Sequence, residues 1–237
     1  MSYLERGQSL VKRLRARNSN PALASSVAVF GLGRFGGALA RELVSTGREV
    51  LGIDTDEKRV QAYANVLTHV VQADTTSEDV LKELGIADFD SAVVAIGTDL
   101  EASILTASLL IQIGVPQVWA KSTSEAHGRI LTQLGVHHVV YPEFEMGRRV
   151  AHMVGGDQLD YVEIDEGFVM AKTQAVPAFA GMSLDKLGLR RDYGIIVVAT
   201  SHADSKYSAA NPETVIELGD FLIVAGPKDR IEEFCRL

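Results

Sequence analysis

The sequence predicts an α/β protein: a Rossmann-type, doubly wound parallel sheet followed by a smaller α+β domain. Three observations carry this prediction. Short apolar or β-branched runs alternate with helical periods from Val27 onward. A glycine-rich turn joins the first run to the first helix, and the rhythm of the pattern changes after Gly155-Gly156-Asp157. Right-handed crossovers then place a ligand crevice at the carboxyl ends of the parallel strands.

The first domain alternates predicted strands with predicted helices. The strands are 27–30, 50–53, 66–72, 91–96, 117–120 and 138–141. The helices lie near 36–46, 57–65, 77–84, 100–113, 124–134 and 143–154. Residues typical of helix ends support these boundaries. Helices are expected to end at Gly85, Gly114 and Gly135, and Pro142 suits a first helical position. The stretch Thr76-Ser77-Glu78-Asp79 resembles a capping box with Asp in place of Glu or Gln.

The chain divides into three predicted regions. Residues 1–26 form a basic, flexible segment, either a solvated tail or an arm that touches a partner or anionic lipid. Residues 27–155 are the Rossmann-type domain, and the Gly155-Gly156-Asp157 stretch acts as a hinge. Residues 156–237 are the second domain, with strands expected at 161–164, 169–175, 194–200 and 220–225. A short helix is expected near 182–187 and a terminal helix from Lys228, with turns at Gly219-Asp220 and Gly226-Pro227.

Composition excludes several classes of protein. The formal net charge of -8 argues against binding to nucleic acid, because phosphate contacts need an excess of Lys and Arg. One cysteine, Cys235, allows no disulfide within the chain and fits a reducing, cytoplasmic compartment. We expect no secretory signal and no membrane span, because polar residues interrupt the longest apolar region, 104–120. A role at the membrane would therefore require docking onto a partner.

The strongest motif is Gly31-Leu32-Gly33-Arg34-Phe35-Gly36, which follows the first strand and opens a helix. Gly31 permits the tight turn, Gly33 lets the backbone approach phosphate and Gly36 allows close packing of helix on strand. Phosphates would then sit on N–H groups at the helix N-terminus. Arg34 either contacts a terminal phosphate and so distinguishes ATP from ADP, or is an exposed arginine at a helix start.

An acid at the end of the second strand suggests which nucleotide binds. Asp54 stands 21 residues after Gly33 and is followed by Thr55. Its carboxylate can accept hydrogen bonds from ribose hydroxyls and would repel a 2′-phosphate. The sequence therefore favours NAD, ATP or ADP over NADP.

Polar or small residues also follow the next three strands. Asp74 and Thr75 end the third strand and are positioned either to reach adenine or ribose, or to cap a helix. Gly97 and Thr98 leave room for phosphate or sugar, and Asp99 fits either that site or a plain N-cap. Lys121 ends the fifth strand, as a phosphate contact or a solvated lysine.

An NAD-dependent oxidoreductase is the rival class, and the sequence argues against an enzyme. A dehydrogenase must place an acid or base beside the nicotinamide. No tyrosine is followed by a lysine four residues later, and the six histidines have no obvious partner. Nor do His, Cys, Asp and Glu gather at metal-ligand spacing.

Several stretches resemble the RCK (regulator of potassium conductance) subunits of Ktr potassium-uptake systems. They are GLGRFGGALARELVSTGREVLGIDTDEKRV, QADTTSEDVLKELGI, AVVAIG, AKSTSEAHGRILTQLGV and YPEFEMGRRVA, with a looser likeness to the RCK C-terminal lobe beyond them. The resemblance implies a non-catalytic regulator that forms an octameric ring on the cytosolic face of a dimeric potassium-translocating (KtrB-like) membrane subunit. ATP would activate ion flux, ADP would inactivate it, and NADH would share the pocket. A Trk-type transporter or another channel is the alternative partner, but Trk-type regulators usually carry two such units in tandem.

The resemblance also implies roles for individual residues. The glycine loop with Arg34 would hold phosphates, Asp54 the ribose, Asp74 and Thr75 the base, and Lys121 would lie near the nucleotide. Glu143 matches a glutamate that holds a cation such as Mg²⁺ near the phosphates, although it also fits a first-turn acid on a helix. The family's C-terminal lobe can bind cyclic di-AMP, for which the candidates here are Arg190, Tyr193, Asn211 and Pro212. Ala210 and Asn211 depart from the usual proline-containing run.

Overall fold

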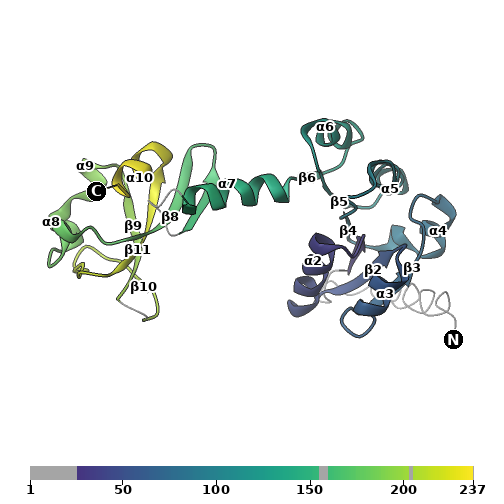
Figure 1. The fold of residues 1–237 in the computed structure, drawn as a ribbon, viewed down its shortest axis with the longest axis horizontal. Coiled ribbons are helices and arrows are strands. Elements are labelled where there is room, and N and C mark those ends of the chain that lie inside the picture. The colour runs from purple at the N-terminus through teal and green to yellow at the C-terminus, as the bar shows by residue number, and fades with distance from the viewer. Residues whose placement is uncertain (1–25, 155–159, 203–204, 237) are drawn as a thin grey trace. The chain divides into compact units, whose positions relative to one another are not determined.

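The computed structural model describes residues 26–154, 160–202 and 205–236, which divide into two compact units between Pro142 and Glu143 (Figure 1). The predicted basic segment 1–26 lies outside the described residues except for Ser26, which belongs to the first strand. The predicted hinge at Gly155-Gly156-Asp157 also lies outside them.

The unit boundary falls after Pro142, the first residue of the long helix α7 (Pro142–Val154), whereas the sequence predicts it after that helix. Two arginines of α7 explain the difference. Arg148 pairs with Glu163, and Arg149 donates to both carboxylate oxygens of Asp160 at 2.8 Å. Both acids lie on the first strand of the second unit, so α7 belongs with that unit.

The first unit is built on one parallel six-stranded sheet in the order β3-β2-β1-β4-β5-β6. The strands are β1 (Ser26–Phe30), β2 (Glu49–Asp54), β3 (His69–Gln72), β4 (Ser91–Val94), β5 (Gln117–Lys121) and β6 (His138–Val140). The chain order reverses between β1 and β4, which is the switch point where open α/β sheets bind ligands. The predicted doubly wound fold is confirmed.

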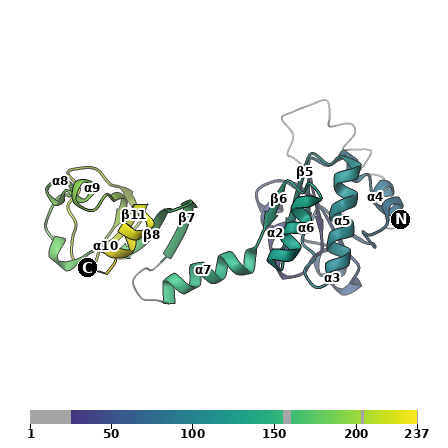
Figure 2. The ribbon, with the colours of Figure 1, turned by 90° about the horizontal axis from the view of Figure 1, so that it is seen from above.

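Helices cover both faces of this sheet (Figure 2), and two apolar clusters lie beneath them. The helices are α2 (Arg34–Ser45), α3 (Glu57–Tyr63), α4 (Glu78–Glu83), α5 (Leu100–Ile113) and α6 (Glu125–Gln133), with a short 3₁₀ turn at Ile86–Asp88. One cluster includes Val29, Leu32 and Ala40. The other includes Phe30, Leu110 and Leu131. Alternate residues of β1 thus face opposite sides, as expected of a strand buried on both faces.

Most predicted helix ends are confirmed. Asp99 caps α5 by accepting from the Ala102 amide at 2.9 Å, and Gly114 ends that helix in the left-handed conformation. The predicted capping box at 76–79 is wrong. Ser77 is the N-cap of α4 but makes no capping hydrogen bond with its side chain. The Thr76 amide and hydroxyl instead donate to the Asp74 carboxylate.

The second unit is an antiparallel five-stranded sheet in the order β10-β9-β11-β8-β7. Its elements are β7 (Asp160–Asp165), β8 (Phe168–Gln174), a 3₁₀ turn (Pro177–Phe179), α8 (Leu184–Leu187), α9 (Leu189–Asp192), β9 (Ile196–Ser201), β10 (Ser208–Ala209), β11 (Phe221–Pro227) and α10 (Lys228–Phe234). The α+β prediction is confirmed. The turn predicted at Gly226-Pro227 is wrong, because these residues pair with Val169 and Phe168 as the end of β11. No helix within the described ranges is both long and apolar enough to cross a membrane.

His202 joins two loops of the second unit. Its Nδ1 lies 2.7 Å from the buried Asp220 carboxylate and 3.3 Å from Glu217. The hydrogen bond to Asp220 and the charge of Glu217 raise the pKa of His202 above its ordinary value of 6.5. The sequence indicates no partner for the histidines, and this acid pair corrects that interpretation.

The raised pKa of His202 predicts how stability changes with pH. The folded state favours the protonated ring, so the stabilisation is complete below the unfolded-state pKa and disappears as pH rises through the higher folded-state pKa. We expect wild type to melt above His202→Gln at about pH 5.5, and the difference in Tm to shrink toward about pH 8.5. Thermal unfolding of both proteins across this range measures it. A difference that does not change with pH would contradict this role of His202.

Candidate nucleotide-binding site

The glycine loop between β1 and α2 is shaped by two steric constraints and one open position. Gly31 has a φ of +94°, and a Cβ there would lie 3.2 Å from the main chain of Ala95. A Cβ on Gly36 would overlap the carbonyl oxygen of Gly31. Gly33 is the N-cap of α2, and a Cβ on it would meet no atom within 4 Å. The loop therefore needs glycine at 31 and 36 to fold, whereas the space beside Gly33 is open to a ligand.

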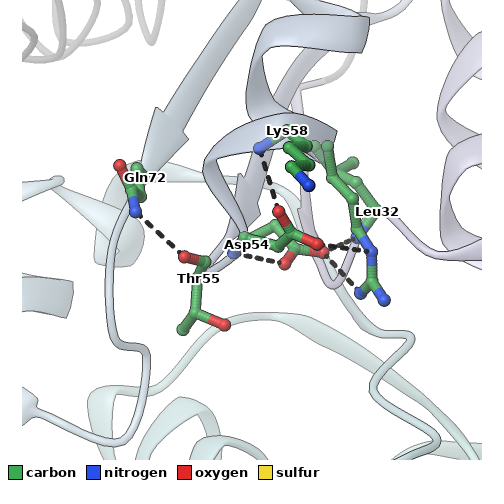
Figure 3. Close-up of polar contacts among 7 residues, drawn as sticks. Leu32, Asp54, Thr55, Lys58 and Gln72 are labelled. Atoms are coloured by element: carbon green, nitrogen blue, oxygen red, sulfur yellow. Dashed lines mark hydrogen bonds and ion pairs between the residues drawn. The ribbon is translucent and has the colours of Figure 1, made fainter.

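Asp54 connects this loop to the end of β2 (Figure 3). Its buried carboxylate accepts from the Leu32 amide at 2.7 Å and from the Asp56 amide at 2.9 Å. Arg59, on α3, places Nη1 3.3 Å from the same carboxylate. Thr55 is exposed, and its carbonyl accepts from the Gln72 side chain at 3.0 Å. The acid that the sequence assigns to ribose thus stands beside the glycine loop.

Lys121 is the most informative residue of the crevice. It ends β5 and is only 8% exposed, so it is not a solvated lysine. Its Nζ lies 5.7 Å from the centre of the Phe35 ring and 3.4 Å from where a Cβ on Gly97 would stand. The fold thereby gathers the glycine loop, the end of β4 and the end of β5 around one ammonium group. Such a group can bind phosphate.

Arg34 is the first residue of α2 and is exposed. It forms no ion pair with another described residue. Thr98 is also exposed, in the loop between β4 and α5. Asp99, next to it, is the N-cap already described.

Asp74 and Thr75 follow β3 but differ in exposure and in their hydrogen-bond partners. Asp74 is exposed, and its hydrogen bonds from Thr76 at 3.0 and 2.7 Å lower the pKa of its carboxyl. Thr75 is buried, and its hydroxyl lies 2.8 Å from that of Thr106 on α5. The expectation that the Thr75 hydroxyl reaches the base needs correction, because that hydroxyl is bonded within the core.

The predicted cation site depends on Glu143. Glu143 is an exposed first-turn acid of α7, as its alternative reading predicts. Among residues 26–154, 160–202 and 205–236, no three His, Cys, Asp or Glu side chains gather in a way that could hold a metal ion. A cation at Glu143 would therefore need further ligands, such as phosphate oxygens.

The residues predicted for cyclic di-AMP lie in the second unit. Arg190 is exposed on α9. Asn211 accepts from the Glu213 amide at 3.1 Å, and the Pro212 carbonyl accepts from the Asp185 amide at 2.9 Å, which brings this stretch against α8. Tyr193 is half-buried and packs edge-on against Phe234, with ring centres 5.9 Å apart. One side of the Tyr193 ring thus packs on the apolar cluster of this unit, and its role in binding cyclic di-AMP stays a prediction.

Sequence comparisons identify the relatives of this chain. Residues 27–142 match the TrkA-N domain and residues 175–237 the TrkA-C domain. The chain is 39% identical over 208 residues to Ktr system potassium uptake protein C of Bacillus subtilis, covering 87% of this chain and 94% of that protein. The chain belongs to the Ktr family. Another Ktr relative is Ktr system potassium uptake protein A of Vibrio alginolyticus, 34% identical over 86% of this chain and 93% of its own length.

A solved structure shows the fold of the first unit independently. The TrkA-N domain of the inner membrane protein ybaL from Escherichia coli superposes with a TM-score of 0.50 at 19% identity. The superposed region covers 56% of this chain and 98% of the solved one. At this identity the likeness concerns the fold alone, and it agrees with the parallel sheet of this Ktr family member.

Proposed function

We propose that this chain is the nucleotide-sensing regulatory subunit of a Ktr-type potassium uptake system, and that it is not an enzyme. The observation that carries the proposal is the buried Lys121 beside Phe35 and Gly97, at the carboxyl ends of the strands. The relatives named as Ktr system potassium uptake proteins, matched over most of their length, support the transport role.

The crevice suits an adenine nucleotide with its phosphates at the start of α2. The open space beside Gly33 and the free amides of a 12-residue helix favour anions. Lys121 supplies a positive charge on one side, and the exposed Arg34 supplies another. Asp54 offers a carboxylate to the ribose hydroxyls, and NAD(H) would share these contacts.

Regulation needs only a difference in affinity between two conformations. Moving a two-state equilibrium from 1:99 to 99:1 takes about 5.5 kcal/mol, or roughly 0.7 kcal/mol for each subunit of an eight-membered ring. One arginine–phosphate contact can supply that amount. In our proposal, Arg34 meets the γ-phosphate, with Mg²⁺ or another cation at Glu143, so that ATP activates the ring and ADP inactivates it.

Replacing Arg34 tests how the site distinguishes the two nucleotides. We expect Arg34→Ala to weaken ATP binding about tenfold and to leave ADP binding nearly unchanged, because only ATP carries the third phosphate. Isothermal titration calorimetry with both nucleotides measures this. Arg41→Ala is the matched control, since Arg41 lies two turns further along α2 and stacks on Tyr63 at 4.9 Å. Equal losses for ATP and ADP in Arg34→Ala would contradict a γ-phosphate role.

The transport function is tested by flux. The chain is combined with a Ktr-type, KtrB-like membrane subunit in potassium-loaded vesicles, on the side that corresponds to the cytosol. We expect ATP to raise potassium flux over ADP, and cyclic di-AMP to lower it through the exposed Arg190 of the second unit. Flux that is the same with and without this chain would refute the proposal.

A further inference from the structure

The carboxylate of Asp54 is already engaged before any ribose arrives. Its Oδ1 accepts from the Asp56 amide, and its Oδ2 accepts from both the Leu32 amide and Arg59. The two amide contacts measure 2.7 and 2.9 Å, whereas the Arg59 contact measures 3.3 Å. The contact from Arg59 is therefore the longest of the three, and it is the one in which a side chain is the donor.

Arg59 can leave this position without disturbing the fold. Its side chain is 45% exposed, whereas that of Asp54 is only 4% exposed. A second acid, Asp56, lies 3.6 Å from its Nε and can hold the guanidinium after it has moved. The amides of Leu32 and Asp56, by contrast, are fixed by the backbone.

Ribose and Arg59 compete for the same carboxylate. A ribose with free 2′ and 3′ hydroxyls brings two O–H donors, and a carboxylate has about four acceptor sites. With three sites taken, a ribose that uses both hydroxyls must displace one donor. Arg59 is the donor that can move, because its contact is the longest and it is made by an exposed side chain. A 2′-phosphate brings no such donor. It instead accepts hydrogen bonds from a guanidinium, with which phosphate forms strong bidentate contacts.

We propose that Arg59 is the specificity-determining residue of the ribose pocket: it opposes binding of the free diol and provides a partner for a 2′-phosphate. The pocket therefore admits 2′-phosphorylated adenine dinucleotides of the NADP(H) class, despite the acid at Asp54. This inference rests on the proposed nucleotide site. It revises the expectation from sequence that Asp54 favours NAD, ATP or ADP over NADP, because Asp54 is paired with Arg59.

The test compares NADPH with NADH on the full-length protein. We expect Arg59→Gln to raise the ratio of their Kd values (NADPH over NADH) about tenfold or more, because it removes a charged hydrogen bond to the 2′-phosphate. NADH should bind as tightly as to wild type, or more tightly. Arg59→Lys keeps the charge without the forked geometry of the guanidinium, so its ratio of Kd values should lie between those of wild type and Arg59→Gln. A second readout compares the Kd of ATP with that of 2′-deoxy-ATP. In Arg59→Gln, the preference for ATP over 2′-deoxy-ATP should be larger than in wild type.

Lys58→Gln is the matched control, since it removes the same charge from the adjacent position of α3. We expect it to leave the NADPH-to-NADH ratio within about twofold of wild type, because no hydrogen bond or ion pair joins its side chain to Asp54 among the described residues. An unchanged ratio in Arg59→Gln, with NADH still bound, would overturn the inference and leave the proposed function standing. An equal rise in Lys58→Gln would also overturn it, because charge alone would then explain the effect. If wild type bound neither ATP, ADP nor NADH, the proposed function would fail as well.

Discussion

Gly36→Ala should destabilise the first unit by about 3 kcal/mol or more. The added Cβ would overlap the Gly31 carbonyl and lie 2.8 Å from the Ala95 Cβ. The first clash is with main chain, which cannot move without displacing the start of α2 from β1. Urea unfolding of wild type and variant, followed by circular dichroism, measures the loss.

Gly33→Ala is the control for that prediction, because it changes the same loop without a clash. Gly33 has φ of −68° and ψ of −165°, values that alanine adopts, and its Cβ would enter open space. We expect its free energy of unfolding to stay within about 0.5 kcal/mol of wild type. ATP binding should nevertheless weaken at least tenfold or so, because the methyl group occupies the space left for phosphate. Stability of Gly36→Ala equal to wild type would refute the packing argument, and unchanged ATP binding in Gly33→Ala would refute phosphate binding at this loop.

Lys121→Met should weaken ATP and ADP binding by about 10-fold to 100-fold. Methionine has a similar length but no charge, so the crevice keeps its shape and loses its buried ammonium group. The free energy of unfolding should change by less than about 1.5 kcal/mol. Calorimetry measures binding, and denaturant unfolding measures stability.

Lys82→Met provides the comparison for Lys121→Met. Lys82 is exposed on α4, where it pairs with Glu78 at 2.7 Å. The substitution Lys82→Met removes the same charge from the same unit but not from the crevice, so nucleotide binding should remain at the wild-type level. Wild-type affinity in Lys121→Met would contradict the account of the phosphate site.

The parallel sheet could be predicted from the sequence because local sequence patterns mark its strands and turns. Strand residues such as Val29 and Ile53 lie in short apolar runs, and the glycines at 31 and 36 are required by backbone geometry rather than by distant contacts. Where pairing depends on remote segments, sequence reasoning was less accurate. Gly226 and Pro227 have the composition of a turn, yet they extend β11 because β8 offers them partners.

The site was predicted by position but not by orientation. Strand ends locate Asp54 and Lys121 at the crevice, because carboxyl ends of parallel strands meet at one edge. Sequence carries no signal for the rotamer of Thr75, whose hydroxyl bonds to Thr106 across 31 residues. Arg59 was missed because its pairing with Asp54 depends on how α3 packs beside β2.

The central claim is that the crevice of the first unit binds adenine nucleotides, and calorimetric titration of the purified chain with ATP, ADP and NADH, with and without Mg²⁺, tests it most directly. We predict saturable binding of ATP and ADP, competition by NADH, and a change in the ATP affinity alone when Mg²⁺ is added. Tight binding of NADH with no competition from either ATP or ADP would contradict the nucleotide-sensor account and support the oxidoreductase alternative.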